Sequence, residues 1–188
     1  MTRSEILSAA AQIISQKGYH ATSMSDIASA VNLQKASLYH HVNSKQEILL
    51  SLLDEALDLV CNRINEVVLE PIPVPQKLRL AIKTYLRTLT EKHDLAAVLL
   101  LEHRSLNEEF RIQHFPRRDR FELLWRDLLR CGTEEDIFDI EDIHIAARAL
   151  LGLMNWVFTW YREDGELSID EISDQYADLF LNGILIRK

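Results

Sequence analysis

Residues 21–45 read ATSMSDIASAVNLQKASLYHHVNSK, and this stretch decides the fold because it predicts two short helices joined by a tight turn. Ser23 and Asp26 have the spacing of a capping box, which sets where the first helix begins. Apolar residues then recur at helical spacing: Met24, Ile27, Ala28 and Val31. Asn32 enters the left-handed region readily, so we expect the chain to reverse there.

The second helix of the pair is expected over residues 34–41, and its outer face is polar. Leu38 and Val42 supply its inward contacts. The side chains that remain facing outward are Lys35, Ser37, Tyr39 and His40. Ser44 and Glu47 form another capping box at the start of the next helix. Lys45 lies in the first turn of that helix, where a cation opposes the helix dipole, so we expect a nearby anion such as a phosphate.

This pattern resembles the DNA-binding domain of TetR-family transcriptional regulators. The residues that carry the resemblance are Gly18, Tyr19, Thr22, Ser23, Ile27, Ala28, Leu38, Tyr39, His40, Ser44 and Lys45. Asn32 stands where the family often has glycine, and Val42 where an aromatic residue is commoner. The resemblance implies a helix-turn-helix domain over residues 1–45 and a larger helical ligand-binding and dimerisation domain over residues 46–188. It implies a repressor that a small-molecule effector releases from double-stranded operator DNA.

The exposed face of the second helix gives a set of expected DNA contacts. We expect Lys35 and Ser37 to meet base edges in the major groove, with Ala36 permitting close approach. Phosphate contacts are expected from Thr22, Tyr39, His40 and Lys45. The full predicted set is Thr22, Ser23, Lys35, Ala36, Ser37, Tyr39, His40 and Lys45. Two alternatives for this segment are a hairpin buried in a larger bundle and a helix-turn-helix adaptor that binds protein.

Composition and charge agree with a helical protein that contacts DNA at one end. The chain has 188 residues, 47% of them apolar, with only 5 glycines and 4 prolines, which favours an all-α fold. Its formal net charge is −8. Residues 1–50 nevertheless carry a net charge of +1, so the acidic residues lie in the rest of the chain. This distribution favours a sequence reader that grips few phosphates over a nonspecific DNA coater.

Capping signals and prolines outline about nine helices. The first runs from Thr2 to Gly18, and a long one from Ser44 to Leu69 ends before Pro71, Pro73 and Pro75. Pro116 is expected to start a helix that ends at Gly132. The last two helices are expected over residues 141–162 and from Ser168 onward.

These last two helices are more apolar than one chain needs, which predicts a twofold four-helix bundle. The expected interface residues are Ala146, Ala149, Gly152, Ile172, Tyr176, Leu179 and Phe180. The alternative is that the penultimate helix is simply the central helix of a monomer. The resemblance to the TetR family favours the dimer.

The resemblance also implies an effector cavity among the middle helices. The mixed aromatic and polar residues expected to line it are Tyr85, Glu102, His103, Phe121, Trp125, Asn155, Phe158 and Thr159. Ordinary core packing is the alternative for the aromatic residues, and a solvated helix end for Glu102 and His103. Arg117, Arg118 and Arg120 form either a solvated basic face or a contact for an anionic ligand such as a coenzyme A thioester.

Signals for catalysis are weak, so the sequence does not predict an enzyme. Glu141 and His144 have the spacing of one di-iron ligand pair, but the sequence contains no second pair of this kind. We therefore expect no catalytic residues, metal or cofactor, and a helical-bundle metalloenzyme is a remote alternative. Cys61 and Cys131 are isolated thiols, which suits a reduced cytoplasmic protein. The longest apolar stretch, residues 143–161, is interrupted by polar residues, so no membrane span is expected.

Overall fold

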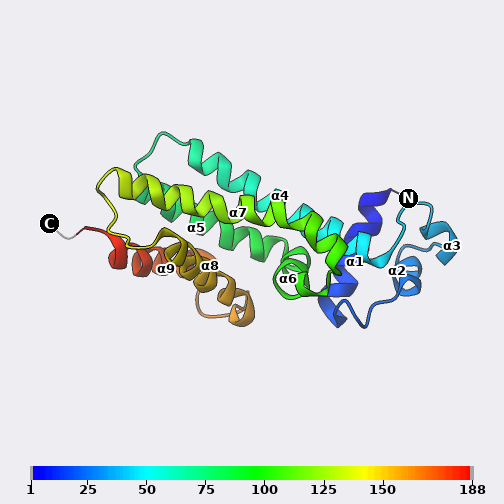
Figure 1. The fold of residues 1–188 in the computed structure, drawn as a ribbon. Helices are drawn as coiled ribbons and strands as arrows, with labels where there is room; N and C mark the ends of the chain where they lie inside the picture. Colours follow the sequence, from blue (N-terminus) through cyan, green and yellow to red (C-terminus); the bar gives the residue numbers. More distant parts are fainter. Residues whose placement is uncertain (1, 187–188) are drawn as a thin grey trace. The chain divides into compact units, whose positions relative to one another are not determined.

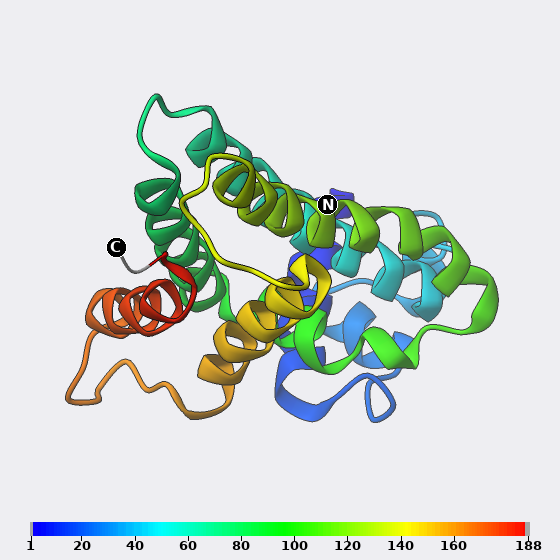
Figure 2. The ribbon, with the colours of Figure 1, turned by 60° about the vertical axis from the view of Figure 1, so that its left-hand side comes forward.

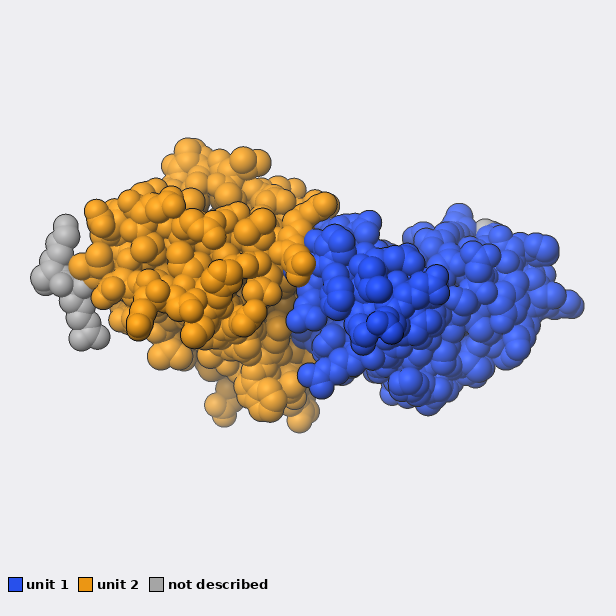
Figure 3. All heavy atoms as spheres, viewed as in Figure 1, with its two compact units in different colours: residues 1–58, 92–118 blue, residues 59–91, 119–188 orange. Residues whose placement is uncertain are grey.

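The computed structural model describes residues 2–186, and most of the described residues lie in helices. Its α-helices are α1 (Arg3–Lys17), α2 (Met24–Ala30), α3 (Lys35–Leu38), α4 (Lys45–Leu69), α5 (Val74–Glu91), α6 (His93–Leu101), α7 (Glu108–Glu134), α8 (Ile143–Trp160) and α9 (Ile169–Ile184), with a 3₁₀ turn η1 (His103–Ser105) (Figure 1). Within the described residues this confirms the predicted all-α fold and its nine helices. Contacts divide the chain into unit 1, residues 1–58 and 92–118, and unit 2, residues 59–91 and 119–188 (Figure 3).

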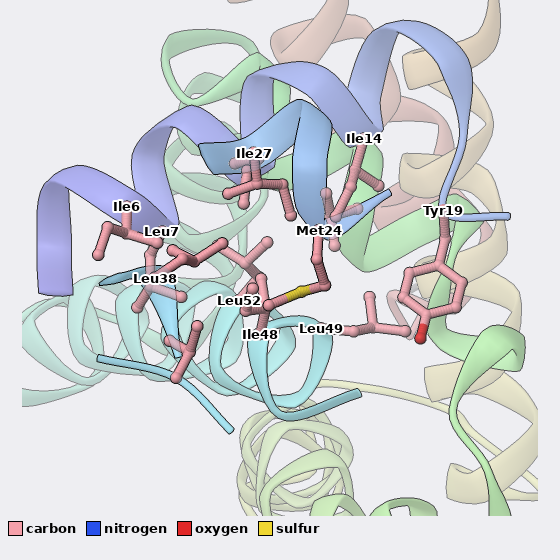
Figure 4. Close-up of a cluster of buried hydrophobic side chains, with 14 of the residues drawn as sticks. Ile6, Leu7, Ile14, Tyr19, Met24, Ile27, Leu38, Ile48, Leu49 and Leu52 are labelled. Carbon is pink, nitrogen blue, oxygen red and sulfur yellow. The ribbon is translucent and has the colours of Figure 1, made fainter. Parts of the chain in front are cut away.

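Unit 1 is built on an apolar cluster that α1, α2, α3 and the first half of α4 share with α6. Ile6, Ile27 and Leu38 are fully buried within this cluster (Figure 4). Leu38 is the single buried side chain of α3, and through it this short helix packs against its neighbours. The cluster therefore holds the helix-turn-helix together while leaving most of α3 exposed.

The local signals at α1 and α2 are confirmed. Thr2 with Glu5 and Ser23 with Asp26 both form complete capping boxes. Asn32 has a φ of 54°, in the left-handed region that the turn requires. The sequence therefore determines both ends of α1 and the reversal after α2.

Two helix boundaries differ from those predicted. The expected helix over residues 34–41 is regular only over α3, because the backbone N–H groups of His40 and His41 donate to carbonyls three residues earlier, at Ser37 and Leu38. This tightening ends α3 after one turn. The helix α7 also begins at Glu108 and not at Pro116.

Pro116 lies inside α7 and removes one backbone donor there. The carbonyl that loses this donor belongs to Ile112, a residue that is 60% exposed, so water can replace the missing bond. Asn107 fixes the earlier start, because its side-chain oxygen accepts a hydrogen bond from the Phe110 N–H at 3.1 Å.

Unit 2 is organised by the packing of α5 against α9, with α8 beside both (Figure 2). Basic residues on α5 pair with acidic residues on α9: Arg87 with Asp170, Arg79 with Asp178, and Lys83 with Asp170 and Asp174. These ion pairs are partly or largely exposed, so they align the two helices more than they stabilise them. The buried residues Ile172, Ala177 and Leu181 supply the apolar side of α9.

The two compact units do not coincide with the predicted boundary between residues 45 and 46. The division instead falls within α4, after Asp58, and assigns α6 and the start of α7 to the unit that contains the helix-turn-helix. Across residues 2–186, no helix is both long and apolar enough to span a membrane. The same residues contain no group of three or more His, Cys, Asp or Glu side chains arranged to hold a metal ion.

Candidate nucleic-acid interface

The segment around α3 presents a polar surface over an apolar anchor. Lys35, Ala36, Tyr39 and His40 are exposed, and Ser37 is half-buried, whereas Leu38 is fully buried. A short helix held from one side in this way can enter a groove of DNA with its outer side chains. The structure therefore brings together five of the residues predicted to contact DNA.

The remaining predicted residues precede or follow this surface. Ser23 is exposed, but its hydroxyl oxygen accepts the Asp26 N–H at 3.1 Å, so its first role is to cap α2. The Asp26 carboxylate accepts the Ser23 N–H at 2.8 Å and lies 3.1 Å from Lys17. The hydrogen bonds from Ser23, followed by the contact with Lys17, lower the pKa of Asp26 to about 2.

Lys45 and Thr22 are both predicted to contact phosphates, and in unit 1 their polar atoms are bonded to backbone carbonyls. The Lys45 ammonium donates to the Thr22 carbonyl at 2.7 Å and to the Tyr19 carbonyl at 3.0 Å, and it lies 4.2 Å from the centre of the Tyr19 ring. Thr22 is 1% exposed, and its hydroxyl donates to the Gly18 carbonyl. The Lys45 charge is therefore solvated by backbone carbonyls of unit 1, and both residues brace the helix-turn-helix.

A brace that the sequence did not predict lies behind the helix-turn-helix in unit 1. The Gln46 side chain donates to the Tyr19 hydroxyl at 2.8 Å and to the Ser105 carbonyl at 2.9 Å. The Gln46 side-chain oxygen accepts the Asn107 N–H at 2.9 Å. Burial raises the pKa of Tyr19, so its hydroxyl stays protonated. No short-range pattern signals this network, because its hydrogen bonds join residues 27, 59 and 61 positions apart.

Glu102, a predicted ligand residue, takes part in the same brace. Its side-chain oxygens accept the Tyr19 N–H at 3.2 Å and the Ser105 hydroxyl at 3.1 Å. Glu102 and His103 both lie in unit 1, whereas the other six predicted ligand residues lie in unit 2. The predicted ligand set is therefore split between the two units.

In unit 2, three of the predicted ligand residues form a buried aromatic cluster. The ring centres of Tyr85, Phe121 and Trp125 lie 5.6–6.3 Å apart. The Tyr85 hydroxyl donates to the Asn155 side-chain oxygen at 2.7 Å, and burial raises the Tyr85 pKa. The Trp125 Nε1 is buried without a hydrogen-bond acceptor among residues 2–186. An unmatched buried donor is costly, so Trp125 Nε1 is a polar group that an acceptor from outside the chain would satisfy.

The last two predicted ligand residues lie at the far end of α8. Phe158 is half-buried. Thr159 is exposed, and its hydroxyl donates to the Trp156 carbonyl at 2.7 Å. Its place in a ligand site stays a prediction, and in this structure its hydroxyl is engaged on the surface of its own helix.

An apolar stripe remains exposed on α8 and α9. Ile145, Trp156 and Leu179 are 64–65% exposed. Of the predicted interface residues, Ala149 and Gly152 are also exposed, and Ala146, Tyr176 and Phe180 are half-buried. Ile172 is 3% exposed, so its side chain is already covered within the chain, and its place at an interface stays a prediction.

The sequence shows the helical spacing of this stripe, but the predicted interface contains only some of its residues. Ile145, Ala149, Gly152 and Trp156 follow one another at intervals of four, three and four residues, which places them on one face of α8. Ile145 and Trp156 were not among the predicted interface residues. An α-carbon substituent at Gly152 would meet nothing within 4 Å, so this face of α8 is open.

Comparison with known proteins covers both parts of the chain. Residues 6–52 match the family described as bacterial regulatory proteins, tetR family, and residues 71–184 match the tetracyclin repressor-like C-terminal domain. The transcriptional repressor KstR2 of Rhodococcus jostii is 27% identical over 184 residues, which cover 97% of this chain and 90% of the relative.

Two solved structures extend the comparison. The structure of the TetR-family regulator PfmR from Thermus thermophilus is 35% identical, with a TM-score of 0.86 over 94% of this chain and 97% of that chain. The structure of AibR in complex with isovaleryl coenzyme A and operator DNA is 25% identical, with a TM-score of 0.87 over 94% of this chain and 96% of that chain.

Proposed function

Because the chain belongs to the TetR family and is a ligand-responsive DNA-binding transcriptional regulator, we propose that it is a cytoplasmic homodimeric repressor that leaves its operator when an effector enters unit 2. It acts by binding and not by catalysis. The observation that carries the proposal is the exposed polar surface of α3, from Lys35 to His40, fixed from below by the buried Leu38.

Each side chain of this surface has a role in the proposal. Lys35 and Ser37 read base edges in the major groove, and Ala36 lets the helix approach closely. Tyr39 and His40 contact phosphates and set the orientation of the helix. Lys45 and Thr22 act from behind, because their polar atoms are engaged with backbone carbonyls.

A pair of lysine variants tests this division of roles. Fluorescence anisotropy would measure binding to DNA from upstream of the protein's own coding sequence, over a range of salt concentrations. We expect Lys35→Ala to cost about 1–3 kcal/mol and to relax the preference at one position of each half-site. Lys45→Ala should lower thermal stability while keeping the sequence preference and the salt slope. Unchanged affinity in Lys35→Ala, or a salt slope reduced by about 1 in Lys45→Ala, would contradict the assignment.

The effector is proposed to occupy the aromatic cluster of unit 2. Tyr85, Phe121 and Trp125 offer apolar area, and the free Trp125 Nε1 and the Tyr85–Asn155 pair offer polar contacts. AibR binds isovaleryl coenzyme A, so we propose an acyl thioester whose carbonyl oxygen accepts from Trp125. This chemistry fits a cluster that is aromatic throughout but has an unmatched donor.

Thermodynamic linkage between effector binding and DNA binding provides the test of the effector. Isovaleryl coenzyme A serves as the probe, and its affinity is measured by calorimetry with and without operator DNA. A ligand that releases the repressor must bind more weakly when the operator is present, by the same factor as it weakens DNA binding. Equal affinities under the two conditions would contradict release by this class of ligand.

The homodimer is proposed to form through the exposed stripe of α8 and α9. Ile145, Trp156 and Leu179 are large apolar side chains at the surface of one unit, and two copies related by a twofold axis would cover them. A dimer also presents two α3 helices, as a two-part operator requires.

A further inference from the structure

Unit 1 contains a hollow that is separate from the surface of α3 and from the aromatic cluster of unit 2. Its volume is about 660 Å³, within the range of small-molecule sites. The lining comes from η1, with His103 and Arg104, and from one face of α7, including Arg111, Phe115 and Arg118. All of these residues belong to unit 1.

The arginines of this hollow are unpaired, whereas their neighbour is not. Arg104, Arg111 and Arg118 are exposed and have no carboxylate within 4.0 Å among residues 2–186. Arg117, by contrast, lies 3.0 Å from Asp54 and 3.4 Å from Asp58. The three unpaired guanidinium groups are therefore free to bind an anion from solution.

Two further features describe the environment inside the hollow. Burial lowers the pKa of His103, and the nearby charges of Arg118 and Arg104 lower it further, so this ring is neutral in a positive field. Glu108 is the only acidic residue among the lining residues described. The local field therefore favours a ligand with more than one negative charge.

Apolar side chains border the same arginines. Ile112 is 60% exposed and Phe115 is 42% exposed, both on the lining face of α7. Guanidinium groups bind phosphate oxygens in pairs, and an exposed aromatic ring offers a face for a flat heterocycle. A ligand that matches both the arginines and the aromatic ring has phosphate groups and an aromatic base.

We propose that this hollow binds the adenosine phosphate group of a nucleotide, with Arg104, Arg111 and Arg118 on the phosphates and Phe115 against the base. The group comes either from a free nucleotide or from the nucleotide end of coenzyme A. Binding at this site is independent of the effector site proposed in unit 2. The effect of this ligand on operator affinity rests on the proposed function.

The position of the hollow gives such a ligand a route to the DNA-binding helices. His103 and Arg104 lie between Glu102 and Ser105, which hydrogen-bond to Tyr19 and Gln46 respectively. A ligand that draws Arg104 toward its phosphates acts on the segment that braces the helix-turn-helix. Occupancy therefore changes operator affinity.

Isothermal titration calorimetry of the full chain tests the site with three probes: ATP, coenzyme A and adenosine. We expect ATP and coenzyme A to bind and adenosine to bind at least tenfold more weakly, because it has no phosphate. If ATP and coenzyme A both bind, a free nucleotide is sufficient to occupy the hollow. If only coenzyme A binds, the ligand is the nucleotide end of coenzyme A. Because coenzyme A is also expected to enter the effector site of unit 2, either result supports the hollow only when the arginine variants described next weaken it. No binding of either probe overturns the site.

Matched arginine variants locate the binding. The double variant Arg111→Ala/Arg118→Ala should weaken the phosphorylated probe at least tenfold, whereas Arg120→Ala, an exposed arginine of the same helix outside the hollow, should not. All three positions are exposed, so circular dichroism should show unchanged folding. Equal weakening in Arg120→Ala would indicate nonspecific surface charge and overturn the site.

Operator binding without any probe separates this proposal from the proposed function. The double variant should bind upstream DNA as the wild type does, because its arginines do not belong to the surface of α3. Loss of DNA binding in the double variant alone would place these arginines in the DNA interface and overturn the nucleotide site. Failure of the wild type to bind DNA would count against the proposed function and leave the calorimetric result intact.

Discussion

The three N-terminal helices bury their large apolar side chains, whereas the last two helices leave several of theirs exposed. In α1, α2 and α3, residues such as Ile6, Ile27 and Leu38 are fully buried, and the exposed surface of α3 is largely polar. On α8 and α9, Trp156 and Leu179 are about two-thirds exposed. The first region is complete within one chain, whereas the second leaves a surface that a second copy can cover.

The interior of unit 2 adds to this contrast. In the helix-turn-helix, the polar groups of Thr22 and Lys45 are bonded to backbone carbonyls. In the aromatic cluster, Trp125 Nε1 has no acceptor among the described residues. The proposed DNA surface therefore has its supporting polar groups paired, whereas the proposed effector site has an interior with one unmatched donor.

The largest effect is expected from a charge placed on the exposed stripe. Leu179→Glu would bury two like charges against each other in a twofold interface, which costs several kcal/mol, on the order of 3–5. Sedimentation should then show monomers, and operator binding should be lost although α3 is unchanged. Leu123→Glu makes the same change at an exposed leucine of α7, outside the stripe, and should remain dimeric. If Leu179→Glu dimerises as strongly as the wild type, the exposed stripe of α8 and α9 is not the dimer interface. The contrast between the two regions would then fail.

Truncating the anchor of α3 should have the next largest effect. Leu38→Ala removes a fully buried side chain and should lower the free energy of unfolding by about 3 kcal/mol, measured by urea denaturation. His40→Ala, on the exposed side of the same segment, should change it by less than about 0.5 kcal/mol. Similar losses in the two variants would show that α3 is not held from one side.

The hydrogen bond between Tyr85 and Asn155 should contribute less to the free energy of unfolding. Tyr85→Phe removes the hydroxyl that donates to Asn155 and should cost about 1 kcal/mol of stability. Tyr39→Phe, at an exposed tyrosine, provides the control for loss of a hydroxyl. A cost near zero in Tyr85→Phe would indicate that water satisfies Asn155 equally well.

The smallest effect concerns the cap of α2 and depends on pH. Asp26 has a folded pKa of about 2 against an ordinary value of 3.8, so its carboxylate stabilises the fold above about pH 4 and ceases to do so as the pH falls toward 2. Asp26→Asn should therefore be less stable than the wild type at pH 7, and the difference in melting temperature should close between pH 4 and pH 2. A difference that stays constant over this range would contradict the capping role.

Local signals predicted the parts of the fold that neighbouring residues determine. The capping boxes at Thr2 and Ser23 and the left-handed Asn32 each depend on residues within three positions of one another, so the sequence shows them directly. The buried spacing of Ile27 and Leu38 also follows from helical periodicity. The surface of α3 was predictable for the same reason.

Long-range partners explain most of what the sequence could not predict. Lys45 was expected to meet a phosphate, but its acceptors are carbonyls 23 and 26 residues earlier in the chain. Glu102 was placed with a ligand, yet it accepts the Tyr19 N–H from 83 residues away. Pro116 was read as a helix start because its signal is local, whereas Asn107 caps an earlier turn and water can serve the carbonyl that Pro116 leaves free.

Discrimination between DNA sequences tests the central claim, that the surface of α3 reads an operator. Fluorescence anisotropy would compare the fragment upstream of the protein's own coding sequence with a fragment of the same length and composition in permuted order. The account predicts that the wild-type protein prefers the upstream fragment by about 10³-fold or more at physiological salt. Equal affinity for the two fragments would contradict it.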